Sequence, residues 1–188
     1  MRPKATARPG GRSARVQQSV HDAVRQLLEE VGRDGLTVPL IATRAGVTPS
    51  TVYRRWGDLQ ELLSDVAVEH LRPEGPPTDH GSLRADLEAY AEQFLEEMAS
   101  DSGRAYIRDA LLGDAEGPNA GQCSAYAAHQ IETILGRAAE RGERTPDLEQ
   151  VMDRVVAPIM YRILFRPDLL SADYSRALVS GALQDATA

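Results

Sequence analysis

Apolar residues recur at steps of three and four along most of the 188-residue chain, and this spacing limits the chain to a helical fold. A predicted helix over residues 13–31 shows the pattern well, with Val20, Val24, Leu27 and Val31 on one stripe. The same spacing predicts further helices over residues 58–71, 82–100, 104–112, 118–141, 145–165 and 171–183. Strict alternation of apolar and polar residues does not run over any useful length. The sequence therefore predicts an all-α protein without a sheet.

A proline- and glycine-rich break over residues 73–77 interrupts this helical pattern. We place a domain boundary there, which gives an N-terminal domain over residues 12–72 and a C-terminal helical domain over residues 73–188. The helix over residues 58–71 precedes the break, and we expect it to pack against both parts.

Two short helices joined by a glycine-centred turn are predicted within residues 36–56, LTVPLIATRAGVTPSTVYRRW. Thr37 and Thr48 are natural N-caps, because a threonine hydroxyl can accept from a free amide of the first helical turn. Gly46 permits the left-handed backbone that a tight turn between helices often needs. In the first helix, Leu40, Ile41 and Ala45 are spaced to face a core. This is the pattern of a helix-turn-helix, in which the second helix enters the DNA major groove.

The second of these helices is polar and basic on its outer side. Val52 and Trp56 are spaced to pack inward, and the remaining surface carries short polar side chains, a tyrosine and two arginines. The alternative is an ordinary helical hairpin inside an all-α core, but such a helix would show a wider apolar stripe. Short polar and cationic side chains suit close approach to phosphates and base edges, so the composition favours DNA binding.

The net charge of −7 hides a strong asymmetry along the chain. Residues 1–57 carry ten Lys and Arg against four Asp and Glu, which gives +6, whereas residues 58–188 give −13. This division indicates a basic DNA-binding head on an acidic body. Residues 1–11 combine Pro, Gly and Arg, and we expect a disordered basic arm that is either a passive tail or brings Arg8 and Arg12 to DNA.

Several short segments resemble the TetR family of bacterial helix-turn-helix transcriptional regulators. Over roughly residues 13–71 the resemblance rests on Thr37-Val38, Ile41-Ala42, Ala45-Gly46-Val47-Thr48, Thr51-Val52-Tyr53 and Leu62-Leu63. A second, weaker match to one subgroup of TetR ligand domains rests on residues 137–143, residues 157–162 and the helix over residues 171–183.

The resemblance implies an all-α homodimer with about nine helices per subunit. Each subunit would have a three-helix DNA-binding domain followed by a helical ligand-binding and dimerisation domain. The helices over residues 145–165 and 171–183 would pair with their counterparts, which agrees with a 145–165 segment that is apolar on more than one side. Two-fold symmetry would place the recognition helices about 34–36 Å apart on double-stranded DNA, at a near-palindromic operator.

The resemblance also implies which residues contact DNA. Thr37 and Thr48 would meet phosphates at helix starts, Tyr53 would donate to a backbone phosphate, and Ser50 and Thr51 would face the groove. Arg54 and Arg55 would each either pair with a guanine or bind phosphate.

The chain departs from the family pattern at two positions. Arg55-Trp56 replaces the usual His-Phe, and we expect Trp56 to keep the packing role. Leu59 stands where a phosphate-binding lysine is usual, so Arg12 or the arm would have to supply that contact.

The family resemblance further implies a repressor that a small-molecule effector releases from DNA. We expect the effector site to use apolar and polar side chains of the C-terminal domain. The residues proposed for it are Tyr90, Phe94, Met98, Tyr106, Arg108, Asp109, Tyr126, His129, Met152 and Tyr161. Methionine and aromatic residues at helical spacing are equally compatible with plain core. Two alternatives remain: a regulator without an effector, and an all-helical ligand-binding or enzymatic domain with a vestigial helix-turn-helix.

No catalytic or cofactor motif stands out in the sequence. The four histidines, His21, His70, His80 and His129, lack a second ligand at metal spacing, and we expect His129 to line the core or a pocket. Cys123 is the single cysteine, which rules out an intrachain disulfide and favours a structural role. Glycine-rich phosphate loops, signal peptides and membrane-spanning runs are not evident. We therefore expect a cytoplasmic bacterial protein that is not an enzyme and needs no cofactor or metal.

Overall fold

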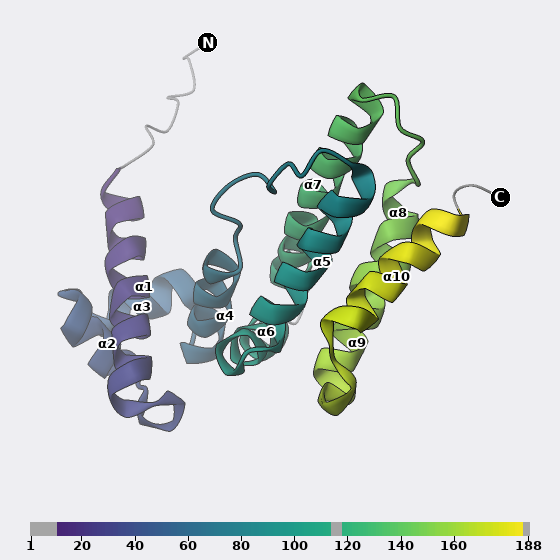
Figure 1. Ribbon diagram of the computed structural model, residues 1–188. Helices are drawn as coiled ribbons and strands as arrows, with labels where there is room; N and C mark the ends of the chain where they lie inside the picture. Colours follow the sequence, from purple (N-terminus) through teal and green to yellow (C-terminus); the bar gives the residue numbers. More distant parts are fainter. Residues whose placement is uncertain (1–10, 114–117, 186–188) are drawn as a thin grey trace, which may run out of the picture. The chain divides into compact units, whose positions relative to one another are not determined.

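The computed structural model describes residues 11–113 and 118–185, and it is helical without a strand over those ranges (Figure 1). The chain divides into two compact units, Met1–Val66 and Ala67–Ala188. The division falls inside a helix, a few residues before the predicted boundary at residues 72 and 73. The predicted arm with Arg8 lies outside the described residues.

The first unit is built from α1 (Arg12–Val31), α2 (Val38–Ala45), α3 (Pro49–Trp56) and most of α4 (Leu59–His70). Apolar side chains from all four helices form its core, as the periodicity predicted. The core residues with the largest buried side chains are Val20, Val24, Leu27, Ile41, Val52 and Leu62.

Two apolar residues of this unit do not face the core as predicted. Val31 is 48 % exposed because it is the last residue of α1, where the apolar stripe reaches the end of the helix. Leu40 is 36 % exposed because the short helix α2 buries only one face, which carries Val38, Ile41 and Ala42.

The turn between α2 and α3 has the geometry that the sequence predicted. Gly46 adopts the left-handed conformation, with φ of 69° and ψ of 31°. The amide of Val47 then donates to the carbonyl of Ala42 at 2.9 Å, which satisfies the end of α2. At the start of α2, the Thr37 hydroxyl accepts from the amide of Leu40 at 3.3 Å, which confirms its capping role.

Thr48 occupies the N-cap position of α3, but the prediction that its side chain caps the helix is wrong. Its hydroxyl instead bonds to the hydroxyls of Ser50 at 2.9 Å and Thr51 at 3.0 Å. The reason is local competition, because two other hydroxyls lie within the same helical turn.

The second unit contains α5 (Leu83–Ala99), α6 (Asp101–Leu112), α7 (Pro118–Glu140), α8 (Leu148–Val151), α9 (Ala157–Phe165) and α10 (Ala172–Asp185). A π-helical segment, Met152–Val156, joins α8 to α9 in one continuous run, so the described residues form nine helices. Helix α6 begins three residues before the predicted start at Arg104, because the Ser100 hydroxyl accepts from the amide of Gly103 at 2.9 Å.

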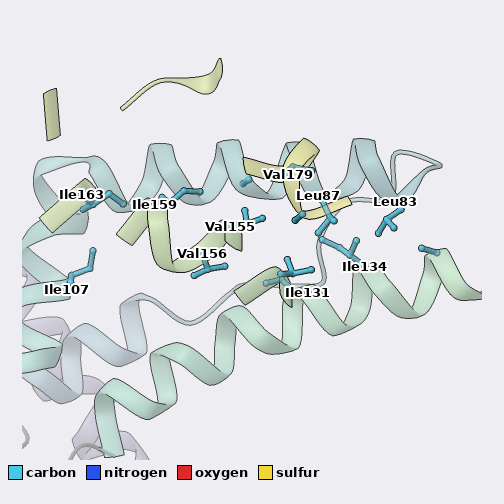
Figure 2. Packing of buried hydrophobic residues seen from close by; sticks show 14 residues of the cluster. Leu83, Leu87, Ile107, Ile131, Ile134, Val155, Val156, Ile159, Ile163 and Val179 are labelled. Carbon is cyan, nitrogen blue, oxygen red and sulfur yellow. The ribbon is translucent and has the colours of Figure 1, made fainter. Parts of the chain in front are cut away.

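The core of the second unit lies between α5, α7 and the run from α8 to α10 (Figure 2). Leu87 of α5, Ile131 and Ile134 of α7 and Ile159 of α9 are all fully buried there. Helix α5 packs against α7, α9 and α10, and it is therefore central to this unit.

The run from α8 to α9 is covered on one side only. Val155, Ile159 and Ile163 face the core, whereas Tyr161 is 55 % exposed and Phe165 is 69 % exposed. The sequence predicted that this segment is covered from two directions. Within a single chain, the second unit covers one of them, and the side that carries Tyr161 and Phe165 is exposed.

The proline-rich connection between α4 and α5 is tied to α7. Gln130 donates to the carbonyl of Gly75 at 2.8 Å, and Arg137 donates to the carbonyl of Pro77 at 2.7 Å. Arg141 pairs with Asp86, a buried carboxylate of α5, at 3.0 Å. This connection is therefore a fixed part of the second unit. None of the helices in the described ranges is long and apolar enough to cross a membrane.

Candidate nucleic-acid interface

Helix α3 presents the polar surface that the sequence predicted. Val52 is fully buried and Trp56 is 9 % exposed, so both pack into the first unit. Tyr53, Arg54 and Arg55 lie on the exposed side, and the predicted packing role of Trp56 is confirmed.

Hydroxyl groups gather at the starts of α2 and α3. The Thr37 hydroxyl accepts a hydrogen bond from the backbone, which leaves its proton able to donate to an incoming group. Thr48, Ser50 and Thr51 form a small hydroxyl cluster in the first turn of α3. Amides at such helix starts, together with hydroxyls, suit a phosphate oxygen.

The two arginines of α3 have different surroundings. Arg55 donates to the carbonyl of Ser13 at 3.1 Å and to its hydroxyl at 2.7 Å, and it also donates to the side-chain oxygen of Gln17. Its guanidinium carbon lies 5.1 Å from the ring centre of Trp56. Arg54 is exposed and makes no hydrogen bond or ion pair to the parts of the chain that the structure describes. Arg54 is therefore the arginine whose guanidinium is available to an external partner.

For Tyr53 and Leu59, the structure gives exposure or packing but, within the described residues, no hydrogen bond that would indicate a role in DNA binding. Tyr53 is 49 % exposed. Arg12 begins α1, but its side chain lies outside the described residues. Leu59 packs against the core of the first unit, which is consistent with an apolar residue at a position where the family usually has lysine.

A polar cluster beneath α3 was missed by the sequence analysis. The Asp65 carboxylate oxygen Oδ2 accepts from the indole of Trp56 at 2.6 Å, from His21 at 2.9 Å and from Gln17 at 3.2 Å. His21 is buried, with 2 % of its side chain exposed. The signal that could have revealed the cluster is a carboxylate that falls between the buried positions Leu63 and Val66 of α4.

The charge on Asp65 is stabilised where it lies. Burial by itself would raise the pKa of this carboxyl group. The hydrogen bonds from His21 and Trp56, with the nearby charge of Arg55, outweigh burial and lower the pKa below its ordinary value of 3.8. Asp65 is therefore an ionised acceptor at neutral pH.

The structure separates the residues that were predicted to bind an effector into three sets. Tyr90, Phe94, Met98 and Met152 are partly buried against the main core of the second unit, and the rings of Tyr90 and Phe94 stack at 5.9 Å. Tyr106 and Tyr126 belong to a smaller cluster around Ala67, Val68 and Ala110, next to buried Asp109. Arg108, His129 and Tyr161 are exposed.

His129 does not lie where the sequence predicted. Its side chain is 79 % exposed, so the prediction that it lines the core or a pocket is wrong for the single chain. It lies on the outer side of α7, opposite the stripe that carries Ile131 and Ile134.

The histidines and the cysteine that were considered as metal ligands or reactive groups do not form a metal site among the described residues. No three His, Cys, Asp or Glu side chains within residues 11–113 and 118–185 are placed to hold a metal ion. Burial raises the pKa of the Cys123 thiol, and a raised pKa disfavours the reactive thiolate form.

These features define the class of the protein. A capped helix, a left-handed glycine turn and a second helix with a polar, cationic outer surface make the first unit a helix-turn-helix DNA-binding domain. The second unit is a separate helical domain with its own core.

Comparison with known proteins identifies the family. Residues 21–66 match the family model "Bacterial regulatory proteins, tetR family", and residues 77–182 match "Tetracyclin repressor-like, C-terminal domain". The chain belongs to the TetR family of transcriptional regulators, which is not a family of enzymes.

Relatives and solved structures agree with this assignment. The chain is 27 % identical to the uncharacterized regulator YdeS of Bacillus subtilis, over 89 % of this chain and 87 % of that protein. It is 29 % identical to the regulator AqdR of Rhodococcus erythropolis, over 76 % of this chain and 68 % of AqdR. The crystal structure of the TetR-family regulator SCO0332 shares the fold, with a TM-score of 0.68, 24 % identity and coverage of 90 % of this chain and 97 % of that one. The protein is thus a helix-turn-helix transcriptional regulator.

Proposed function

We propose that this regulator is a cytoplasmic repressor that binds a near-palindromic operator as a homodimer and leaves it when a small molecule occupies the second unit. In this proposal Arg54 reads a base in each half-site. Thr37, Thr48, Tyr53 and the helix starts bind phosphate and fix the register.

The free guanidinium of Arg54 is the observation that carries the DNA-reading part of the proposal. A guanidinium can donate two parallel hydrogen bonds to the O6 and N7 atoms of guanine, provided that it is not already paired. Arg54 meets this condition among the described residues, whereas Arg55 is engaged by α1.

The exposed apolar side of α9 supports the proposed homodimer. Tyr161, Leu164 and Phe165 are 55 %, 42 % and 69 % exposed, and they lie together at the end of the helix. Large exposed apolar groups that gather on one surface are typical of an interface. We assign the interface to α9 with α10, which correspond to the predicted segments over residues 145–165 and 171–183.

Tyr90, Phe94, Met98 and Met152 are the residues that we favour for an effector site. They are partly buried at the edge of the main core, and methionine with aromatic rings gives an adaptable apolar lining. Burial raises the pKa of Tyr90, so its phenol stays protonated and can donate a hydrogen bond to a bound molecule. Because Arg108, His129 and Tyr161 are exposed, we omit them from this site.

Selection of bound duplexes from a random double-stranded library tests the proposed operator. The expected result is a near-palindrome whose two half-sites are centred about one helical turn apart, roughly 34–36 Å. If repeated selection at low salt enriches no sequence, the proposed specific operator does not exist.

A further inference from the structure

We infer that Asp65 is a positioning residue for DNA recognition, which seats the end of α3 and engages Arg55 so that Arg54 faces the bases. This inference deepens the proposed function, and it rests on the base-reading role proposed for Arg54. It concerns only the first unit, which ends at Val66.

Three donors from two other helices converge on one oxygen of Asp65. Trp56 from α3 lies at 2.6 Å, His21 from α1 at 2.9 Å and Gln17 from α1 at 3.2 Å. An ionised carboxylate only accepts hydrogen bonds, so it satisfies all three donors together. Hydrogen bonds to a charged acceptor are also stronger than those between neutral groups.

Gln17 extends this arrangement to the surface of α3. Its side-chain nitrogen donates to Asp65, and its side-chain oxygen accepts from the guanidinium of Arg55. The orientation of the Gln17 amide is therefore set at both ends. Arg55 is held in addition by Ser13 and lies over the ring of Trp56.

These contacts fix the rotation of α3 about its own axis. Arg55 and Trp56 are the last two residues of the helix, and both are tied to α1 or α4. Since successive residues of an α-helix are about 100° apart around the axis, fixing two of them also fixes the direction of Arg54. The loss of the carboxylate charge should loosen the end of α3 while its apolar anchor, Val52, stays buried.

The inference is tested with Asp65→Asn and Trp56→Phe. The first removes the charge but keeps the shape, and the second removes the indole donor but keeps an aromatic ring in the core. Glu61→Gln is the matched control, because it removes one negative charge from the same helix outside the cluster. Affinities are measured by fluorescence anisotropy for the library-selected duplex and for a duplex of scrambled sequence, well below the melting temperature of each variant.

We expect Asp65→Asn and Trp56→Phe each to reduce the preference for the selected duplex roughly tenfold, the effect of one weakened charge-assisted hydrogen bond. Affinity for the scrambled duplex should stay close to that of wild type, and Glu61→Gln should leave the preference unchanged. If Asp65 acts through Arg54, the double variant Asp65→Asn/Arg54→Ala should lose no more preference than Arg54→Ala alone.

Three results would overturn the inference: an unchanged preference in both variants, equal losses on the two duplexes, or additive losses in the double variant. If one variant fails to fold, the other still gives the decisive comparison. A wild-type protein without any preferred duplex would contradict the proposed function instead, so the two failures are distinguishable.

Discussion

Neighbouring residues of the same type can have different surroundings, as Arg54 and Arg55 show. The sequence placed both on the exposed side of a predicted recognition helix and left each as a reader of bases or a binder of phosphate. What distinguishes them is Ser13, which binds Arg55 from 42 positions earlier in the chain. A contact of that range is set by tertiary packing, so local sequence pattern does not reveal it.

The contacts of Asp65 are also set by tertiary packing and are not visible in the local sequence pattern. A single carboxylate inside an apolar stripe is visible in the sequence, but its three donors come from residues 9, 44 and 48 positions away. By contrast, Thr37 and Gly46 were predicted correctly, because the groups that they contact lie within five positions.

The lowered pKa of Asp65 predicts a specific dependence of stability on pH. A carboxyl group whose pKa is lower in the folded state stabilises that state above the unfolded pKa, and this contribution is lost as the pH falls through the folded value. Wild type should therefore exceed Asp65→Asn in free energy of unfolding at neutral pH, and the difference should shrink below about pH 4. Urea unfolding at a series of pH values measures it.

Asp34→Asn is the control for this measurement, because Asp34 is an exposed carboxylate of the same unit. Its difference from wild type should be small at every pH. A difference between wild type and Asp65→Asn that is constant from pH 7 down to pH 2 would contradict a stabilising charge on Asp65.

At the scale of the helices, periodicity predicted where the elements lie but not how they end. The helices of the first unit and the long helices α5, α7 and α10 fall where their apolar stripes placed them. The early start of α6 and the π-helical segment Met152–Val156 were not predicted. The early start of α6 comes from the Ser100 cap, which apolar spacing does not register. The π-helical segment keeps helical spacing, so periodicity does not distinguish it from an α-helix.

The first turn of α6 lies so close to the end of α5 that position 103 tolerates only glycine. A Cβ at Gly103 would lie 2.1 Å from the carbonyl oxygen of Glu97 and 2.9 Å from the Cα of Met98, and both are backbone atoms. Gly103→Ala should therefore destabilise the protein by about 1–3 kcal/mol or more, as measured by urea unfolding.

Gly136→Ala provides the matched comparison, because a Cβ at that exposed position of α7 meets nothing within 4 Å. Alanine favours a helix interior over glycine, so this variant should gain about 0.5–1 kcal/mol. Equal unfolding free energies for the two variants would show that crowding at Gly103 is not what fixes the turn.

For the whole molecule, the charge division along the chain indicates DNA binding by the N-terminal part, and the exposed side of α9 supports the proposed homodimer. The sequence assigned +6 to residues 1–57, which include α1, α2 and α3. It also assigned the excess apolar surface of residues 145–165 to a partner chain. The effector residues stay a prediction, because methionine and aromatic residues at helical spacing look the same in a core and in a pocket.

The proposed dimer predicts a specific response to Phe165→Glu. This residue is 69 % exposed, so the substitution should leave the fold of each chain intact while burying a charge in the interface. Sedimentation velocity at micromolar concentration should show a monomer, and affinity for the selected near-palindrome should fall. Leu111→Glu, at an exposed position of α6, should remain dimeric. A stable dimer of Phe165→Glu would place the interface elsewhere.

A base-substitution scan of the library-selected duplex tests whether α3 reads DNA sequence through Arg54. Each position is replaced in turn, and affinity is measured for wild type, Arg54→Ala and Tyr53→Phe. Arg54→Ala should abolish the preference at one position of each half-site, a loss of about 1–3 kcal/mol of discrimination there. Tyr53→Phe should weaken all duplexes alike and leave the salt dependence unchanged, because a neutral phenol releases no counterion. If Arg54→Ala instead weakens matched and substituted duplexes equally, Arg54 binds only the DNA backbone and does not read a base.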